Sequence, residues 1–248
     1  MLLLAASLGM NLLLTRALYD SFTKLQFSRI FPLGYASEPE RALAVTGSAG
    51  QPSIAFWGDS RAYMWDFNSL AGHWTILNLA HGGQTSSQVR LQLAAAPTTR
   101  TNCAVLQVGI NDLHPLGALE GHKQAILAGL RGNLLALRDA LSARTDRLIL
   151  TTIFPPAHVP LVRRFTWDPH TLQTIATVNR FIRDAADGDR VRLLDANALL
   201  RDSDGYLLAR YVDPDFFLHL NQAGYERLNP ELSRLCAPAE QQPEPLPR

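Results

Sequence analysis

The sequence predicts an α/β domain built on a parallel sheet with helices on both faces. Short apolar runs alternate with longer segments that can carry helices, which is typical of parallel sheets. The runs are SIAFW (53–57), TILNLA (75–80), CAVLQV (103–108), RLILTTIF (147–154) and VRLLD (191–195). With 248 residues, 47% of them hydrophobic, the chain is long enough to bury a substantial core.

Two helices of this domain are clear from the residue pattern. The segment HKQAILAGLRGNLLALRDALSA (122–143) carries an apolar stripe at helical spacing, formed by Ile126, Leu130, Leu134, Leu137 and Leu141. A last helix is expected after Asn221, a good N-cap, and a break at Pro230 is left open.

The ends of the chain differ from this pattern. Residues 1–28 are predicted to form an apolar helix that begins MLLLAASLGMNLLL, which has the size of a signal-peptide core and favours an exported or membrane-anchored protein. The alternative is an amphipathic helix packed on the domain or on a membrane surface. Residues 29–52 are predicted as a linker, 53–236 as the folded domain and 237–248 as a disordered tail.

Charge and cysteine content exclude several classes of function. The net charge is +1 without blocks of like charge, so a nucleic-acid partner is not expected, and a small-molecule or polymer substrate is the better interpretation. Cys103 and Cys236 are the only cysteines, which argues against a disulfide framework and a cysteine-rich zinc site. Cys103, inside an apolar run, is expected to be a plain core residue, and the thiols leave the compartment open.

Polar residues follow three of the predicted strands. Gly58, Asp59 and Ser60 come directly after the first run, so the Ser60 hydroxyl can project from the carboxyl edge of the sheet. Gly83 lies in the turn after the second run, where a glycine lets the backbone N–H approach a ligand. Asn111, in Gly-Ile-Asn-Asp (109–112), brings an amide donor to the same edge after the third run.

His219 is the best placed of the seven histidines, because it lies in the loop just before the Asn221 cap and can reach that edge. The other six histidines show no spacing typical of a metal site.

These pieces, in this order, resemble the SGNH/GDSL hydrolase family over about Ser53 to Leu235. The resemblance implies a three-layer, flavodoxin-like fold and the cleavage of carboxylic esters. Ser60 would be the nucleophile and His219 its general base, with an oxyanion hole made by Ser60, Gly83 and Asn111. It implies neither a metal nor another cofactor.

One position departs from the family pattern. The family has an Asp three residues before the His, but Phe216 stands there in this chain. We favour Asp215 as the acid, assuming a one-residue bulge, over Asp213, and a Ser-His dyad is the third option. Arg61, Asp112 and His81 are open between alignment of the site and ordinary structural roles.

The segment FPPAHVPLVRRFTWDPH (154–170) is long for a connection beside a strand end, and such loops often line substrate sites. Arg163, Arg164 and Trp167, with Phe165, are therefore candidate substrate contacts. They would suit an acyl chain against the aromatic rings or an acidic sugar against the arginines, in a glycan or lipid ester, and a plain surface loop is the alternative.

Three other functions are compared with ester hydrolysis. An O-acyltransferase or deacetylase acting on a polysaccharide would need the same serine chemistry. A binding module with decayed catalysis is suggested by the displaced acid. A nucleotide-binding domain is disfavoured, because no Gly-rich phosphate loop follows the first strand.

Overall fold

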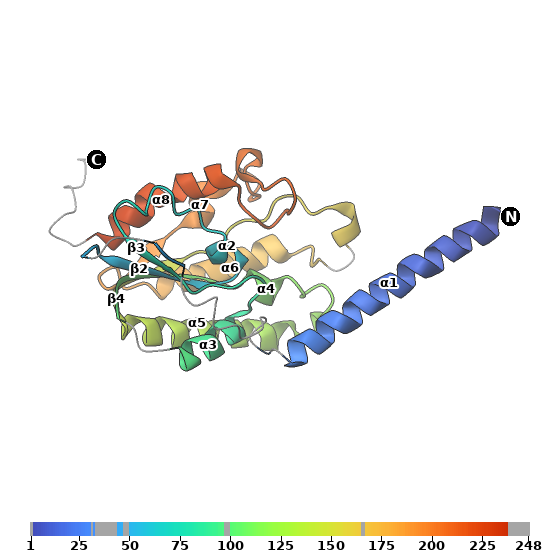
Figure 1. Ribbon diagram of the computed structural model, residues 1–248, viewed down its shortest axis with the longest axis horizontal. Helices are drawn as coiled ribbons and strands as arrows, with labels where there is room; N and C mark the ends of the chain where they lie inside the picture. Colours follow the sequence, from blue (N-terminus) through green and yellow to red (C-terminus); the bar gives the residue numbers. More distant parts are fainter. Residues whose placement is uncertain are drawn as a thin grey trace.

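The computed structural model describes residues 2–30, 32, 44–46, 50–96, 100–164 and 167–237. It contains a six-stranded sheet in the order β1-β3-β2-β4-β5-β6 between two layers of helices (Figure 1). The strands are β1 Ala44–Thr46, β2 Ser53–Gly58, β3 Thr75–Asn78, β4 Thr101–Gln107, β5 Thr145–Thr151 and β6 Val191–Leu194.

Strands β2 to β6 pair in parallel, which confirms the predicted fold class. Their order, β3-β2-β4-β5-β6, is the flavodoxin-like order, and the chain reverses its direction of travel across the sheet between β2 and β4. Ligands of such sheets bind outside the carboxyl ends of the strands at this switch point. β1 pairs antiparallel with β3 at one edge and lies within the segment predicted as a linker.

The helices are α1 Leu2–Ile30, α2 Ser60–Tyr63, α3 Ser86–Ala95, α4 Ile110–Leu113, α5 Lys123–Ser142, α6 Thr171–Asp184, α7 Ala196–Leu200 and α8 Gln222–Cys236. Short 3-10 turns occupy Glu120–His122, Leu161–Arg163 and Ala209–Tyr211. α3, α5 and α6 cover one face of the sheet, and α7 and α8 cover the other. Figure 1 shows α3 and α5 below the strands and α7 and α8 above them.

Alternation along β2 explains why the sheet has two cores. Ala55 and Trp57 join the cluster under α3, α5 and α6, whereas Ile54 and Phe56 join the cluster under α7 and α8. Successive side chains of a strand point to opposite faces, so a strand covered on both sides reads as a continuous apolar run.

The two predicted helices form close to their expected bounds. On α5 the four leucines of the stripe are buried, and Ile126 is partly buried against them. α8 begins after Asn221, whose side chain accepts a hydrogen bond from the Gly224 N–H at 3.2 Å, and it continues through Pro230.

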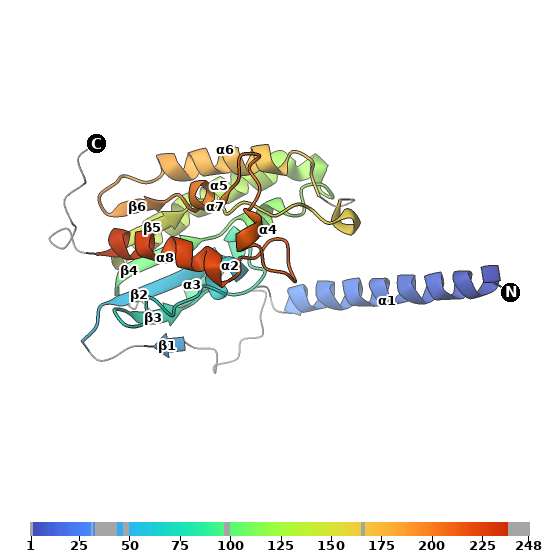
Figure 2. The same ribbon diagram turned by 90° about the horizontal axis from the view of Figure 1, so that it is seen from above.

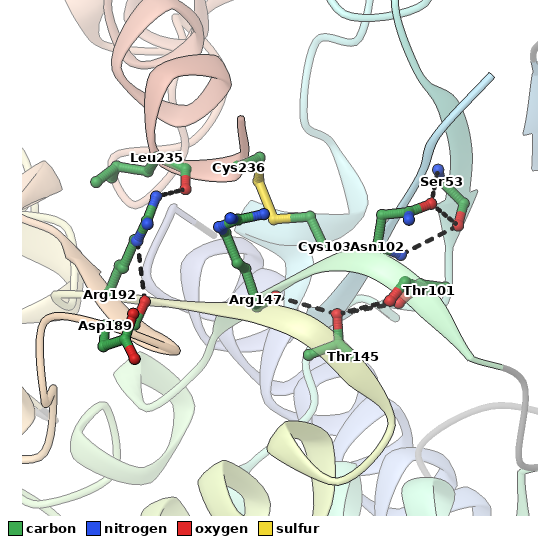
Figure 3. Close-up of a disulfide and its surroundings, with 10 residues drawn as sticks. All are labelled: Ser53, Thr101, Asn102, Cys103, Thr145, Arg147, Asp189, Arg192, Leu235 and Cys236. Carbon is green, nitrogen blue, oxygen red and sulfur yellow. Dashed lines mark hydrogen bonds between the residues drawn. A yellow bond between two sulfur atoms is a disulfide. The ribbon is translucent and has the colours of Figure 1, made fainter. Parts of the chain in front are cut away.

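The expectation that Cys103 is a plain core residue is wrong, because Cys103 forms a disulfide with Cys236 (Figure 3). The first lies on the central strand β4 and the second at the end of α8, and both are buried. Beside the disulfide, Arg192 Nη1 donates to the Leu235 carbonyl at 2.7 Å. The last helix is therefore fastened to the sheet at the end remote from the strands' carboxyl edge.

α1 projects away from the domain (Figures 1 and 2). Its side chains from Ser7 to Leu25 are exposed, including apolar ones such as Leu13, Leu18 and Phe22. This differs from a helix packed on the domain. In the described part of the chain, no helix is long and apolar enough to cross a membrane. Residues 238–248 of the predicted disordered tail lie outside the described residues.

Candidate active site

The structure brings Ser60 and His219 together, although 159 positions separate them in the chain. Ser60 is the first residue of α2, and it follows β2 and Asp59, the N-cap of α2. His219 lies in the loop before α8. The distance between Ser60 Oγ and His219 Nε2 is 3.0 Å, and both residues are partly buried. This is the contact that a histidine needs to take the hydroxyl proton.

Gly58 makes the sharp turn from β2 to Ser60 feasible. Its φ is +142°, and a Cβ at this position would lie 1.7 Å from the backbone oxygen of Gln107 on the neighbouring strand. Asp59 then accepts a hydrogen bond from the Arg61 N–H at 2.9 Å through Oδ1, which caps α2. The close approach of β2 and β4 therefore fixes where the serine leaves the sheet.

The backbone around His219 is held at several points. The His219 N–H donates to the Phe216 carbonyl at 2.9 Å, and the His219 carbonyl accepts from the Asp213 N–H at 3.1 Å. The Phe216 ring lies against the imidazole, with centroids 4.6 Å apart and 34° between the planes. An aromatic ring thus packs on the histidine from the position where the family pattern has an Asp.

The two candidate acids are placed differently. Asp213 is partly buried, and its charge raises the pKa of His219. Asp215 is exposed and donates its backbone N–H to Asp213 Oδ1 at 2.8 Å. Among the described residues, neither carboxylate is hydrogen-bonded to the His219 ring. The structure therefore associates Asp213 with the imidazole electrostatically and does not bring Asp215, the favoured residue, to it.

Burial and the nearby Arg61 guanidinium outweigh Asp213 and hold the pKa of His219 below its usual 6.5. Burial of the Asp59 carboxyl raises its pKa to about 7, and burial of the Arg61 guanidinium lowers its pKa to about 10. At neutral pH the imidazole is therefore largely uncharged, as a general base requires.

The three predicted oxyanion donors lie on adjacent turns. Ser60 follows β2, Gly83 follows β3 with a φ of +77°, and Asn111 lies in α4, which follows β4. Asn111 Nδ2 donates to the Gln84 carbonyl at 2.9 Å, which ties the asparagine to the residue after Gly83. An amide carries two N–H groups, so this bond leaves the second available.

Asp112 has a structural role. It is buried, and its two oxygens accept hydrogen bonds from Ser86 N at 2.9 Å and Ser86 Oγ at 2.6 Å at the start of α3. Burial raises the pKa of this carboxyl. Asp112 thereby fixes the Gly83 turn relative to α4, which carries Asn111.

The predicted substrate contacts lie beyond His219. Arg163 lines a cavity of about 420 Å³ with Asp213, Asp215 and Phe216. Arg164 and Trp167 line a neighbouring cavity of about 360 Å³.

Trp167 also packs on Phe217, with centroids 5.4 Å apart, and Phe217 packs on Phe216. Aromatic rings therefore connect the long loop to His219. Phe165 lies outside the described residues.

Sequence reasoning missed the packing of Phe216 on the imidazole and the burial of Arg61. Within the described residues, no group of three or more His, Cys, Asp or Glu side chains could hold a metal ion. The site consists of a serine, a histidine and hydrogen-bond donors, and this set can perform acyl transfer without further groups.

Comparisons with known proteins show the family of the chain. The chain matches the GDSL-like Lipase/Acylhydrolase family over residues 47–227, well over half of its length. No curated protein matches it.

Three solved structures share the fold. A Streptococcus pneumonia protein provisionally described as a platelet activating factor has a TM-score of 0.62 at 20% identity, over 94% of this chain and 99% of that one. A GDSL-like lipase from Bacteroides thetaiotaomicron has a TM-score of 0.58 at 18% identity, over 87% and 98%. Axe2, an acetylxylan esterase from Geobacillus stearothermophilus, has a TM-score of 0.55 at 17% identity, over 77% and 95%. The chain belongs to the GDSL-like lipase/acylhydrolase family, a family of ester hydrolases.

Proposed function

We propose that this protein is a serine hydrolase that cleaves acyl esters, with Ser60 as nucleophile and His219 as general base. The observation that carries the proposal is the 3.0 Å contact between Ser60 Oγ and His219 Nε2 at the switch point of the sheet. A histidine with a lowered pKa, next to a serine at a strand-to-helix turn, is suited to remove the hydroxyl proton.

The reaction would proceed in two steps. Ser60 Oγ attacks the ester carbonyl while His219 Nε2 takes its proton, and the imidazolium then delivers that proton to the leaving alcohol. Water, deprotonated by His219, then attacks the acyl-serine, and the imidazolium returns the proton to Ser60 Oγ as the acid leaves. The N–H groups of Ser60 and Gly83 and the free N–H of Asn111 would stabilise the oxyanion of each tetrahedral intermediate.

We assign the acid to Asp213 in place of Asp215. Asp213 is the carboxylate whose charge acts on His219, and its backbone is bonded to the histidine carbonyl. Asp213→Asn should lower kcat about 10-fold, less than the ~10⁴-fold loss known for a directly bonded triad Asp. Asp215→Asn should leave kcat unchanged. The reverse order of effects would restore Asp215, and two unchanged variants would indicate a dyad.

Hydrolysis of p-nitrophenyl acetate by the full chain tests the proposal. Ser60→Ala and His219→Ala should each abolish turnover above the uncatalysed rate, and Ser87→Ala, an exposed serine on α3, is the matched control. Retained turnover in Ser60→Ala would refute the mechanism. A folded wild type without turnover would favour the binding-module alternative.

The substrate class follows from the loop beyond the histidine. Phe216 packs on His219, Phe217 and Trp167 extend this aromatic surface away from it, and Arg163 offers a positive charge. We propose that a glycan or lipid ester lies along these groups, and acetyl esters of a glycan are favoured by the Axe2 likeness. Trp167→Ala should raise KM for such a substrate more than for p-nitrophenyl acetate. Acyl transfer to an added sugar instead of water would identify a transferase.

We also propose export and membrane association. A buried disulfide is typical of proteins from oxidising compartments, and the exposed apolar side chains of α1 can enter a lipid surface. The full chain should float with lipid vesicles, and a variant with Leu13, Leu18 and Phe22 changed to Glu should not. Equal flotation of the two would contradict the role of α1.

A further inference from the structure

Arg61, the residue after the nucleophile, has an unusual environment. Its side chain is fully buried, and it is the bulkiest of the fully buried side chains described. Arginine is almost never fully buried unless its charge is compensated, because removing a guanidinium from water is costly. Its Nη2 has no hydrogen-bond partner among the described residues, so the compensation is incomplete. The position therefore calls for a reason other than stability.

The guanidinium joins the nucleophile turn to the histidine loop. Arg61 Nε donates to the Leu218 carbonyl at 2.7 Å, and Leu218 directly precedes His219. Nη1 donates to the Phe154 carbonyl at 2.8 Å, beyond the end of β5, and the guanidinium lies over the Phe154 ring at 5.5 Å. The planar fork of arginine suits two such carbonyls better than the single ammonium of lysine does.

The backbone of the same residue extends the connection. The Arg61 carbonyl accepts a hydrogen bond from the Tyr225 hydroxyl of α8 at 3.0 Å, and the Arg61 N–H donates to Asp59. One residue thus contacts the turn of Ser60, the loop of His219 and the helix that follows it.

His219 needs such a support because no carboxylate among the described residues is bonded to its ring. In a Ser-His-Asp site the acid orients the imidazole through a direct hydrogen bond. Here the His219 backbone is bonded to Phe216 and Asp213, and the ring packs against Phe216. These contacts do not link the histidine to the serine, whereas the Arg61 bond to Leu218 does.

We propose that Arg61 is a positioning residue that holds the His219 loop against Ser60 through the Leu218 carbonyl. The inference rests on the proposed serine hydrolase function and concerns the same site. Arg61 does not contact substrate, because its side chain has no exposed surface. Its loss should therefore reduce kcat and leave KM unchanged.

The charge of Arg61 supplies a second, independent readout. Burial of the imidazole and the charge of Arg61 lower the pKa of His219, and the charge of Asp213 raises it. Asp59 and Tyr225 are the other titratable groups that interact with Arg61. Arg61→Met should therefore raise the pKa of His219, whereas Arg61→Lys should keep it low. A purely structural role of Arg61 in the core does not predict a selective loss of kcat with an unchanged KM.

The experiment compares Arg61→Met with Arg192→Met in the full chain. Arg192 also donates two hydrogen bonds to carbonyl groups, those of Asp189 and Leu235, but at the far end of the sheet (Figure 3), and so it controls for the loss of two such bonds away from the site. Turnover of p-nitrophenyl acetate gives kcat and KM. The shift of the His219 ring protons with pH, assigned with His219→Ala, gives its pKa without any need for activity.

We expect Arg61→Met to lower kcat about 100-fold, the loss associated with a displacement of about 1 Å, with KM within twofold. A kcat within threefold of that of Arg192→Met, or a rise in KM that accounts for the loss of kcat/KM, would overturn the proposal. If Arg61→Met does not fold, Arg61→Lys decides: kcat should fall while the His219 pKa stays at the wild-type value, and an unchanged kcat would overturn the proposal. An inactive wild type would instead refute the proposed function. The two failures can be told apart, because the pKa of His219 is measured without any need for activity.

Discussion

Breaking the disulfide should cost this domain a large part of its stability. Cys103 and Cys236 are separated by 133 positions, so the bond closes most of the domain into one loop. The loop-closure entropy removed from the unfolded chain corresponds to about 5 kcal/mol for this length. Measured losses are usually about 2–4 kcal/mol, because unfolded chains keep some structure. Domains are stable by only about 5–15 kcal/mol in total.

The assay is equilibrium urea unfolding of the wild type and of the Cys103→Ala/Cys236→Ala variant. We expect the free energy of unfolding to fall by about 3–5 kcal/mol, and the urea dependence to become steeper because the unfolded chain expands. The double variant also loses two sulfur atoms from the core. Wild type unfolded in the presence of a thiol reductant is the control for this loss, because it lacks the disulfide bond but keeps both sulfur atoms. If both measurements stay within about 0.5 kcal/mol of the oxidised wild type, the reasoning from loop closure is wrong.

Three further predictions concern the site. Because His219 must be neutral to act as a base and its pKa is lowered, kcat/KM should rise with pH to a plateau with a midpoint below 6.5, and a midpoint above 6.5 would contradict the burial of the imidazole. Asn111→Ala should lower kcat by about 10²–10³-fold, equivalent to about 2.7–4 kcal/mol, and an effect on KM alone would exclude it from the oxyanion hole. Asp59 has a raised pKa of about 7, so its protonated form stabilises the fold below pH 4 and this contribution is lost as pH rises through 7. The stability of wild type relative to Asp59→Asn, measured by urea unfolding, should therefore fall from pH 4 to pH 7, and a pH-independent difference would contradict the raised pKa.

The part of the site that the sequence predicts is the part that depends on local pattern. Each of Ser60, Gly83 and Asn111 follows an apolar run, and parallel strands present their carboxyl ends at one edge, so the order of the runs is enough to bring these residues near one another. His219 can be predicted in the same way, because it lies in a loop before a clear N-cap.

The remaining features depend on contacts between distant segments. The bridge between Val212 and Leu220 joins the two ends of the loop that carries Asp213, Asp215 and His219, and spacing alone pointed to Asp215. The disulfide requires that the end of α8 cross β4, which two cysteines in a sequence do not reveal. Arg61 looks like an ordinary helix residue until its bond to Leu218 is seen, 157 positions away.

Covalent labelling of Ser60 tests directly whether this serine is an activated nucleophile. The full chain is incubated with a fluorophosphonate, which reacts with activated serines, and the mass of the intact protein and of its peptides is measured. We expect one adduct per chain on Ser60, which is lost in Ser60→Ala and forms much more slowly in His219→Ala. A folded wild type that stays unlabelled, or an adduct that persists in Ser60→Ala, would contradict it.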